Sequence, residues 1–431
     1  MDLMKNKEIN AYMELVCTQI KFKDIHKNIK EELIDHINSI VEENMKKGLS
    51  LEESIDIGIK QLGDPYILGK ELNKVHKPKP EWSILALTFI FTLIGILSIY
   101  AMSLQDLWTD WRIKGMVRTS IIMFVAGIAI IVGLYFFDYR KIKPFSKYLY
   151  IGTSIFLILG DRYRTFYRVT RNFNYITPFL YAIALSGIFS KNRWEKNKIF
   201  SNLIILFLPI IMIIAFQFSV VTPIIMYFTM VLVLIFVSKG SVKYIFGSIG
   251  VSAIVAFLSI INQPYRIERI KCMFNFLRDP LGHGYMNFQL RRLISSAGLL
   301  GNRMNIDKAE MPILGLPEMH TDFIFSYIIY AFGWLAGISI IALSIVFFIR
   351  LIKTVKSIQD NYGRLLVSTF SSLFIIQFIY NILMVLGLAP IAGISMPFIS
   401  YGTVLNMVNM IMIGIISSVY RRKNIIVEKD F

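Results

Sequence analysis

Ten apolar stretches separated by charged loops constrain the fold of this 431-residue chain more than any other feature. A membrane-spanning helix needs about 20 predominantly apolar residues. Hydrophobic residues make up 55% of the sequence, which excludes an ordinary soluble globule. The fifth and sixth stretches are nearly continuous, and one helix through both would be about 50 Å long, too long for a hydrocarbon core of about 30 Å. We therefore expect a hairpin at Gln217–Pro223.

These stretches predict an all-α, polytopic membrane protein of about ten transmembrane helices, because helices satisfy their own backbone hydrogen bonds in lipid. An even number of spans places both termini on one side of the membrane. A large loop, residues 262–322, follows the seventh span. The predicted spans are Trp82–Met102, Thr119–Phe137, Tyr148–Gly160, Tyr175–Phe189, Leu203–Phe218, Val220–Val237, Val242–Ile261, Phe323–Ile349, Leu365–Leu388 and Met396–Tyr420.

Lysine and arginine residues are concentrated in the loops of one side. The positive-inside rule makes this side cytoplasmic, so a bacterial cell membrane protein with cytoplasmic N- and C-termini and an extracellular 262–322 loop is expected. Most of the net charge of +17 then needs no nucleic acid to explain it. Two short outer loops depart from the rule: the first mildly, with Arg112, Lys114 and Arg118, and the second more strongly, with four arginines. The basic inner segments are 140–147, 191–198, 239–243, 350–364 and 421–423.

Residues 1–79 are charged and amphipathic, which predicts a small cytoplasmic helical domain rather than a cleavable signal peptide. Ser50 and Glu53 have the spacing of a capping box, so a helix should begin at Leu51 and end at Gly63. Asp64 should cap the next helix, with Pro65 in its first position. An earlier helix is expected over Ile20–Met45. Cys17 falls inside and Cys272 outside, so no disulfide is expected.

The loop 262–322 is too polar and too rich in turn signals to be a simple connector. It contains Asp279-Pro-Leu-Gly-His-Gly-Tyr285 and ends in Pro317-Glu-Met-His-Thr-Asp322, directly before an apolar stretch. Ionisable residues at the edge of a span are candidates for function. Taken by itself, Asp279 could simply start a turn before Pro280. Similarly, Thr321 or Asp322 could cap the following helix.

The chain resembles the shape, elongation, division and sporulation (SEDS) family, which includes the FtsW, RodA and SpoVE proteins. The resemblance rests on three segments: the Asp279–Tyr285 string with Gln289 and Ser295–Gly301 behind it, the string Leu316–Phe325, and the block from Gln377 to Gly402. The N-terminal piece separately resembles a helical prefix found ahead of some Gram-positive membrane proteins, through Leu62-Gly-Asp-Pro65. That likeness implies a regulatory or docking module with a cytoplasmic partner.

Three family patterns differ in this chain, one of them after Tyr401-Gly402, where Thr-Val replaces Gly-Ser-Ser. The family's Gln-Pro-Ser-Glu region corresponds to Tyr167–Pro178, where the acidic residue is missing. The family's Gln-Pro-Asp-Leu-Gly-Thr appears as Gln217-Phe-Ser-Val-Val-Thr222, without its aspartate. The chain is thus expected to be a divergent member.

The resemblance implies a peptidoglycan glycosyltransferase that polymerises lipid II, the undecaprenyl-pyrophosphate-linked precursor, at the outer face of the membrane. Division, cell shape or sporulation would be the process, and a penicillin-binding protein transpeptidase the partner. The alternatives are a precursor flippase and a non-catalytic cell-wall scaffold. Asp279 is the expected catalytic residue, either as general base or as ligand of a divalent cation, Mg²⁺ or Mn²⁺.

The remaining candidates would bind substrate. Four outer arginines could clamp pyrophosphate, since guanidinium groups match phosphate oxygens, although lipid headgroups or Asp161 are equally good partners. Gln377 and Asn381 share a helix face, where they could instead hold helices together. A metal site of His283, His320 and Glu318 is conceivable but matches no standard ligand spacing. The candidates are Arg162, Arg164, Arg168, Arg171, His283, Gln289, Glu318, His320, Asp322, Gln377, Asn381 and Ser400.

Overall fold

A computed structural model describes residues 6–78, 80–104, 111–162, 167–191, 194, 198–216, 221–240, 243–250, 254, 264–275, 279–301 and 316–423. Within these ranges the chain forms helices and loops, and its β-structure is limited to an isolated bridge between Gly298 and Gly301. The all-α prediction is therefore confirmed. The chain divides into two compact units, one made of residues 1–80 with 420–431 and the other of residues 81–419.

The first unit is built from four short helices around its own apolar core. The predicted capping box is confirmed, because Ser50 Oγ accepts from Glu53 N while the Glu53 carboxylate accepts from Ser50 N. Asp64 Oδ1 caps the next helix, and Pro65 is its first residue. The helix expected from Ile20 begins only at His26, after a 3₁₀ turn. The elements are α1 (Lys7–Thr18), η2 (Lys23–Ile25), α2 (His26–Lys46), α3 (Leu51–Leu62) and α4 (Pro65–His76).

The C-terminal segment belongs to this first unit, which no feature of the sequence had indicated. Arg422 is only 4% exposed, and its Nε donates to Asp24 Oδ2 at 2.8 Å. The Arg421 guanidinium lies over the Phe22 ring, 5.3 Å from its centroid. Of the two cysteines, Cys17 lies in this unit and Cys272 in the other, and both are buried.

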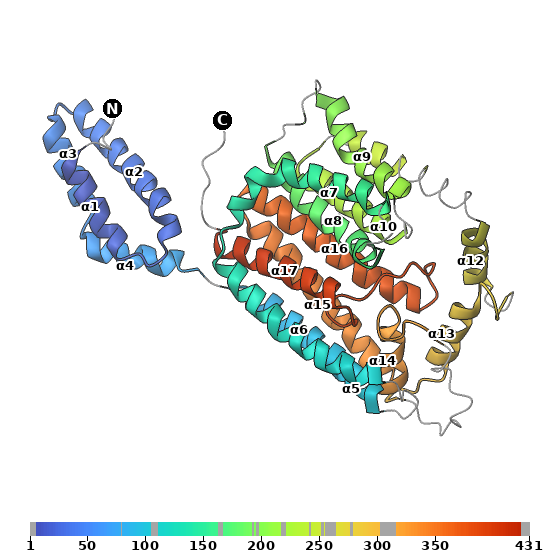
Figure 1. Cartoon of the computed structure of the whole chain (residues 1–431). Helices are drawn as coiled ribbons and strands as arrows, with labels where there is room; N and C mark the ends of the chain where they lie inside the picture. The colour runs from blue at the N-terminus through green and yellow to red at the C-terminus, as the bar shows by residue number, and fades with distance from the viewer. Residues whose placement is uncertain are drawn as a thin grey trace. The chain divides into compact units, whose positions relative to one another are not determined.

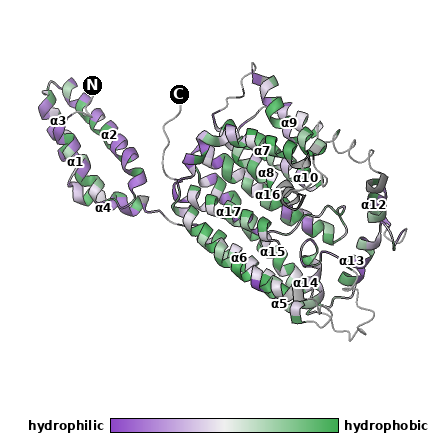
Figure 2. Cartoon of the chain, in the orientation of Figure 1, coloured by the Kyte–Doolittle hydropathy of each residue, from purple (hydrophilic) through white to green (hydrophobic). Residues whose placement is uncertain are grey.

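The second unit is a bundle of apolar helices (Figure 1). Five of its described helices are long and apolar enough to cross a membrane, and three more apolar segments are shorter. Figure 2 shows the contrast with the first unit, whose helices contain more hydrophilic residues. The helices are α5 (Trp82–Leu104), α6 (Trp111–Phe136), α7 (Ser146–Arg162), α8 (Tyr167–Ser190), α9 (Ile199–Phe216), α10 (Val221–Val237), α12 (Pro264–Phe274), α13 (Tyr285–Ser295), α14 (Ile324–Phe332), α15 (Trp334–Ser357), α16 (Asn361–Val385) and α17 (Thr403–Arg421).

Burial differs sharply between helices of similar apolarity. In α16, 72% of the apolar window is buried, and its neighbours include α8, α10 and α15. In α6 only 6% is buried, although its mean hydropathy is higher. An apolar helix that leaves its side chains exposed needs an apolar solvent, so α6 lies on the lipid-facing side of the bundle. The buried α16 is the central helix against which the site is built.

Two predicted spans are interrupted. The eighth breaks at Gly333 (φ 86°), which separates α14 from α15. The tenth was predicted from Met396 but becomes helical only at Thr403. Residues 390–402 form a loop instead, with positive φ angles at Gly393 and Phe398 that a helix cannot contain. The expected Gln217–Pro223 hairpin lies largely outside the described residues, as does most of the seventh span.

Candidate functional site

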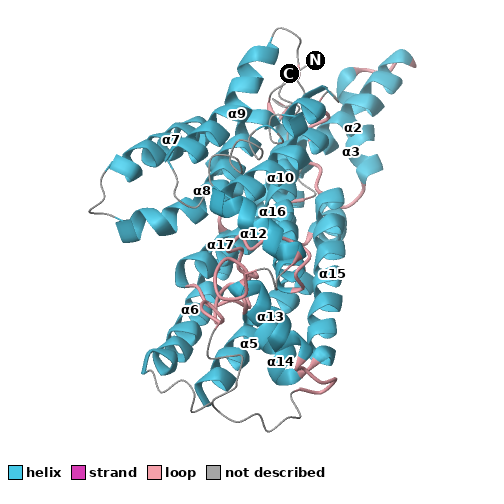
Figure 3. Ribbon diagram, turned by 90° about the vertical axis from the view of Figure 1, so that its right-hand side faces the viewer, coloured by secondary structure: helices cyan, strands magenta, loops and turns pink. Residues whose placement is uncertain are grey.

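Two loops far apart in sequence are tied together at the site, and we refer to residues 316–323 and 390–402 together as the loop frame. Ser400 Oγ donates to Thr321 O at 2.7 Å, and Tyr401 N donates to His320 O at 2.9 Å. Ser395 Oγ donates to Asp322 Oδ1 at 2.7 Å. Figure 3 shows these loops in pink among α13, α14 and α17. The frame thus unites the second and third segments that carried the family resemblance.

Two buried helix residues anchor this frame. Asn381 of α16 is fully buried, and its Nδ2 donates both to Asp322 O at 2.8 Å and to Ile394 O at 2.6 Å. Thr222 of α10 donates from its hydroxyl to Ala392 O. Each bond supplies a hydrogen-bond donor to a loop carbonyl, in place of the water that this carbonyl would bind in the unfolded chain. Asn381 therefore acts as a bracket between the two loops, which supports the structural reading of this candidate.

The frame also depends on unusual backbone conformations. Glu318 and Phe398 have φ angles of 56° and 65°, a region that residues other than glycine rarely adopt. At Glu318 the turn is closed by Thr321 N, which donates to Glu318 O at 3.1 Å. At Phe398 the ring is 2% exposed and stacks on Phe374 with centroids 5.3 Å apart. Tertiary packing offsets the local backbone cost at Phe398, whereas a local hydrogen bond closes the turn at Glu318.

Burial changes the acid–base behaviour of two frame residues. Desolvation raises the pKa of Asp322, although the hydrogen bond from Ser395 opposes the rise. Desolvation lowers the pKa of His320, and the nearby Glu318 carboxylate partly opposes the fall. The His320 ring also packs against Tyr401, with centroids 5.7 Å apart. Asp322 and His320 are thus shielded from water, whereas the Glu318 side chain is exposed.

Asp279 lies in a separate, self-contained turn. Its carboxylate Oδ2 accepts from His283 N at 2.7 Å, and its carbonyl accepts from Gly284 N at 2.9 Å. Gly282 approaches the carboxylate so closely that a side chain there would collide with both Asp279 oxygens. The Asp279 side chain remains half-exposed, so the turn fixes the carboxylate while leaving it accessible. This combination suits a general base or an anionic ligand.

The other candidates have diverse positions. Gln377 is 1% exposed and donates to Leu373 O in its own helix at 2.9 Å. Gln289 of α13 is half-buried, and its Oε1 has no partner among the described residues. His283 is exposed. Of the arginines, Arg164 and the side chains of Arg162, Arg168 and Arg171 lie outside the described residues.

The described residues contain no group of three or more His, Cys, Asp or Glu side chains that could hold a metal ion. The three-ligand metal site suggested for His283, His320 and Glu318 is therefore wrong. The reason is geometric: Glu318 and His320 belong to the loop frame, whereas His283 is part of the Asp279 turn.

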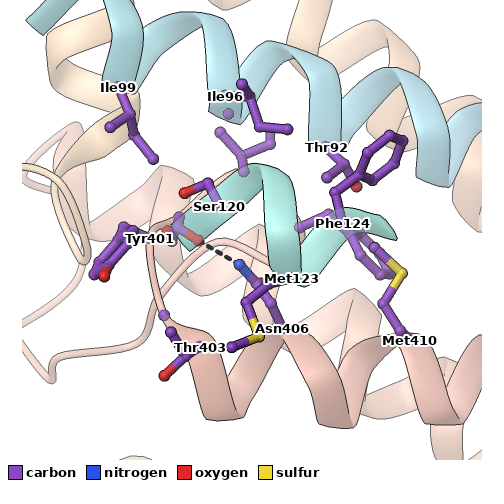
Figure 4. A pocket seen from close by; sticks show the side chains of 15 residues that line it. Thr92, Ile96, Ile99, Ser120, Met123, Phe124, Tyr401, Thr403, Asn406 and Met410 are labelled. Carbon is purple, nitrogen blue, oxygen red and sulfur yellow. Dashed lines mark hydrogen bonds between the residues drawn. The ribbon is translucent and has the colours of Figure 1, made fainter. Parts of the chain in front are cut away.

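A pocket lies on the far side of the frame loop, between α5, α6 and the start of α17 (Figure 4). It is partly open, and the roughly 420 Å³ of space within its walls includes open solvent. Asn406 lines it and donates from Nδ2 to Ser400 O at 2.9 Å. Its walls are mostly apolar, with Ile96, Phe124 and Met410 among them, and polar groups gather near the loop. Ser400 is thus shared between the pocket wall and the frame.

The fold and the interlocked loops define a multi-pass helical membrane protein with a loop site at the ends of its helices. The profile of the cell cycle protein family, which comprises FtsW, RodA and SpoVE, matches residues 176–425. The chain therefore belongs to this family, the SEDS proteins, as the sequence motifs predicted.

Relatives align over most of the chain. Stage V sporulation protein E of Bacillus subtilis is 27% identical over 80% of this chain and 98% of its own length. A probable peptidoglycan glycosyltransferase FtsW of Geobacter metallireducens is 26% identical, over 82% and 98% respectively. A chain from a peptidoglycan synthase complex has a TM-score of 0.62 at 16% identity, over 80% of this chain and 98% of its own. This last likeness supports the fold.

The structure adds residues that sequence reasoning did not single out. Ser395 and Asn406 hold the frame through Asp322 and the Ser400 carbonyl, and both stand in or just after the third motif block. Thr222 ends the divergent Gln217–Thr222 segment and still reaches the frame. A search for small polar residues in the motif blocks would have found the first two, but nothing local identifies their partners.

Proposed function

We propose that this protein is a peptidoglycan glycosyltransferase that polymerises lipid II at the outer face of the bacterial membrane. The proposal is supported by family membership and by full-length relatives that are named as glycosyltransferases. The single observation that carries it is the Asp279 carboxylate, fixed by His283 N yet accessible.

Asp279 would act on the attacking sugar. As a sugar hydroxyl forms its bond to the anomeric carbon of the second substrate, its proton passes to the Asp279 carboxylate and undecaprenyl pyrophosphate leaves with the bonding electrons. A positioned general base typically contributes about 10²–10⁴-fold in rate. The loop frame would hold the neighbouring surface rigid while the reacting groups meet.

A divalent cation would be held at this site jointly by the protein and the phosphates of the substrate. Mg²⁺ is commonly bound by one or two carboxylates together with substrate phosphates. The Asp279 carboxylate fits such a role, and Mg²⁺ or Mn²⁺ would supply charge neutralisation for the leaving pyrophosphate. Arg162, Arg164, Arg168 and Arg171 are proposed to assist by binding the same phosphates.

The partners and orientation follow from the same proposal. A penicillin-binding protein transpeptidase would crosslink the new strands, and the N-terminal unit would bind a cytoplasmic partner. Both termini would be cytoplasmic.

The orientation can be tested by labelling cysteines from outside the cell. Cys272 is buried and is a poor topology probe, whereas Leu281 is 91% exposed. An impermeant thiol reagent should label Leu281→Cys on intact cells and leave Glu52→Cys of α3 unlabelled; the reverse pattern would refute the outer-face site.

The decisive experiment measures glycan polymerisation from lipid II by purified protein, with and without a transpeptidase partner. Asp279→Asn keeps the turn-forming ability of the residue and removes its charge. It should lower the rate by about 10²–10⁴-fold, or roughly 3–5 kcal/mol in barrier.

The matched control is Glu268→Gln, which removes another carboxylate of the same loop, one that pairs with Lys271 at 2.8 Å. It should retain activity. Equal rates for wild type and Asp279→Asn would exclude Asp279 as the base. A wild type that binds its partner but makes no polymer would indicate a scaffold, and one that moves lipid II across vesicles without polymerising it would indicate a flippase.

A further inference from the structure

Helix α4 presents one face to its own domain and leaves the opposite face uncovered. Its inner face is fixed by Gly69, where a side chain would lie 2.7 Å from Val16 O and 2.8 Å from Gln19 Cβ. Asn73 on the same side accepts from Lys21 N at 3.1 Å. The orientation of α4 against α1 is therefore determined by close backbone contact.

The uncovered face combines exposed apolar and basic side chains. Ile67 and Tyr66 are 63% and 48% exposed. Lys70 and Lys74 are exposed at three and seven positions after Ile67, so all three residues share one side of the helix. Glu71, four positions after Ile67, is exposed on the same side, so the lysines outnumber the single acidic residue there. Lys77 follows directly after the helix and is also exposed. Apolar side chains next to lysines are the pattern of a helix that lies in a membrane interface.

A short linker joins the C-terminal end of α4 to a membrane-spanning helix. Only five residues, 77–81, separate α4 from α5, the first membrane-spanning helix, and they reach at most about 20 Å. Trp82, 72% exposed, begins α5 and is a residue type typical of the membrane interface. The linker therefore limits how far the C-terminal end of α4 can lie from the start of α5.

We propose that the α4 face formed by Tyr66, Ile67, Lys70, Lys74 and Lys77 binds the anionic lipid surface of the membrane that holds the protein. The apolar side chains enter the headgroup region, and the lysines contact lipid phosphates. Lipid charge would then fix the position of the N-terminal unit, independently of the glycosyltransferase activity.

The test uses the full chain in nanodiscs, with an environment-sensitive fluorophore attached to Ile67→Cys. In phosphatidylcholine mixed with phosphatidylglycerol, the emission should shift to the blue, and a lipid-bound quencher should reduce it. In phosphatidylcholine alone, or at high salt, both effects should weaken, because exposed charges are screened.

Lys70→Gln, Lys74→Gln and Lys77→Gln together should shift the equilibrium towards the released helix by roughly 100-fold, at about fivefold per lysine. The matched control, Lys46→Gln with Lys47→Gln and Lys60→Gln, removes the same charge from α2 and α3 and should change nothing. An emission that is the same in both lipids would overturn the proposal. So would a blue shift that persists in neutral lipid without quenching, because that would place Ile67 against protein.

Discussion

The loop frame and the Asp279 turn differ in how their parts are held. In the frame, side chains from α10, α16 and the loops themselves bond across large sequence separations, and Asn381 and Ser400 are buried. In the turn, Asp279 is held by its own neighbours His283 and Gly284 and stays accessible. The frame thus resembles a structural core, whereas the turn resembles an exposed reactive group. Substitutions in the frame should therefore affect stability first, and substitutions in the turn activity first.

The largest effect on stability should come from Asn381→Leu. It removes the donor to two buried carbonyls, those of Asp322 and Ile394, and should lower the free energy of unfolding by roughly 2–4 kcal/mol. Gln377→Leu on the same helix is the control, because Gln377 donates only to its own helix. It should cost about 1 kcal/mol or less. Thermal unfolding in detergent would compare them, and equal losses would show that Asn381 is no bracket.

Gly393→Ala should have a somewhat smaller effect on stability. Gly393 has a φ of 64°, and an added Cβ would lie 3.3 Å from Asp322 Oδ2. A left-handed conformation costs a residue with a side chain about 1–2 kcal/mol. Gly402→Ala, in the same loop, meets only an ordinary 3.8 Å contact and should be nearly neutral. If both melt at the same temperature, the frame does not require the Gly393 conformation.

Gly282→Ala should affect activity rather than stability, because it lies in the Asp279 turn. The new methyl group would displace the Asp279 carboxylate, which is the end of a side chain and can move without unfolding the loop. We expect polymerisation to fall about tenfold, equivalent to about 1.4 kcal/mol, with an unchanged melting temperature. Gly115→Ala, which meets open space, is the control. A fall in melting temperature with full activity would reverse the assignment of the two regions.

The smallest effect concerns pH. Burial raises the pKa of Asp322 above its usual value of 3.8, so the folded protein holds this proton more tightly than the unfolded chain does. This contribution to stability is complete below the unfolded pKa and is lost as pH rises through the folded pKa. Asp322→Asn should remove that part of the pH dependence while preserving an acceptor for Ser395. Parallel melting curves of wild type and variant from pH 4 upwards would contradict this.

His320 should behave in the reverse sense. Its pKa is lowered by burial, so its contribution is present above the unfolded value of about 6.5 and is lost as pH falls through the folded value. His320→Gln should therefore flatten the stability profile on the acidic side of that value. Melting curves of Asp322→Asn and His320→Gln that changed in the same pH direction would show that burial is not the cause of either shift.

By itself the sequence determined the class of the protein, its helices and the motifs of the SEDS family. Apolar length, capping at Ser50 and Asp64, and the three motif strings are local properties, and local chemistry is sufficient to interpret them. It did not predict that the last helix begins only at Thr403, because the expected span started at Met396.

Only the tertiary structure decided what the motif residues do. Asn381 and Asp322 lie 59 positions apart, and Thr222 and Ala392 lie 170 apart. Their meeting depends on how α10, α14 and α16 pack, which no local pattern encodes. In the packed structure Gln377 is buried, Ser400 donates a hydrogen bond to Thr321 O, and Asp279 remains accessible. Hydropathy specifies which residues enter the membrane, whereas side-chain packing selects which polar groups support the site and which remain available for chemistry.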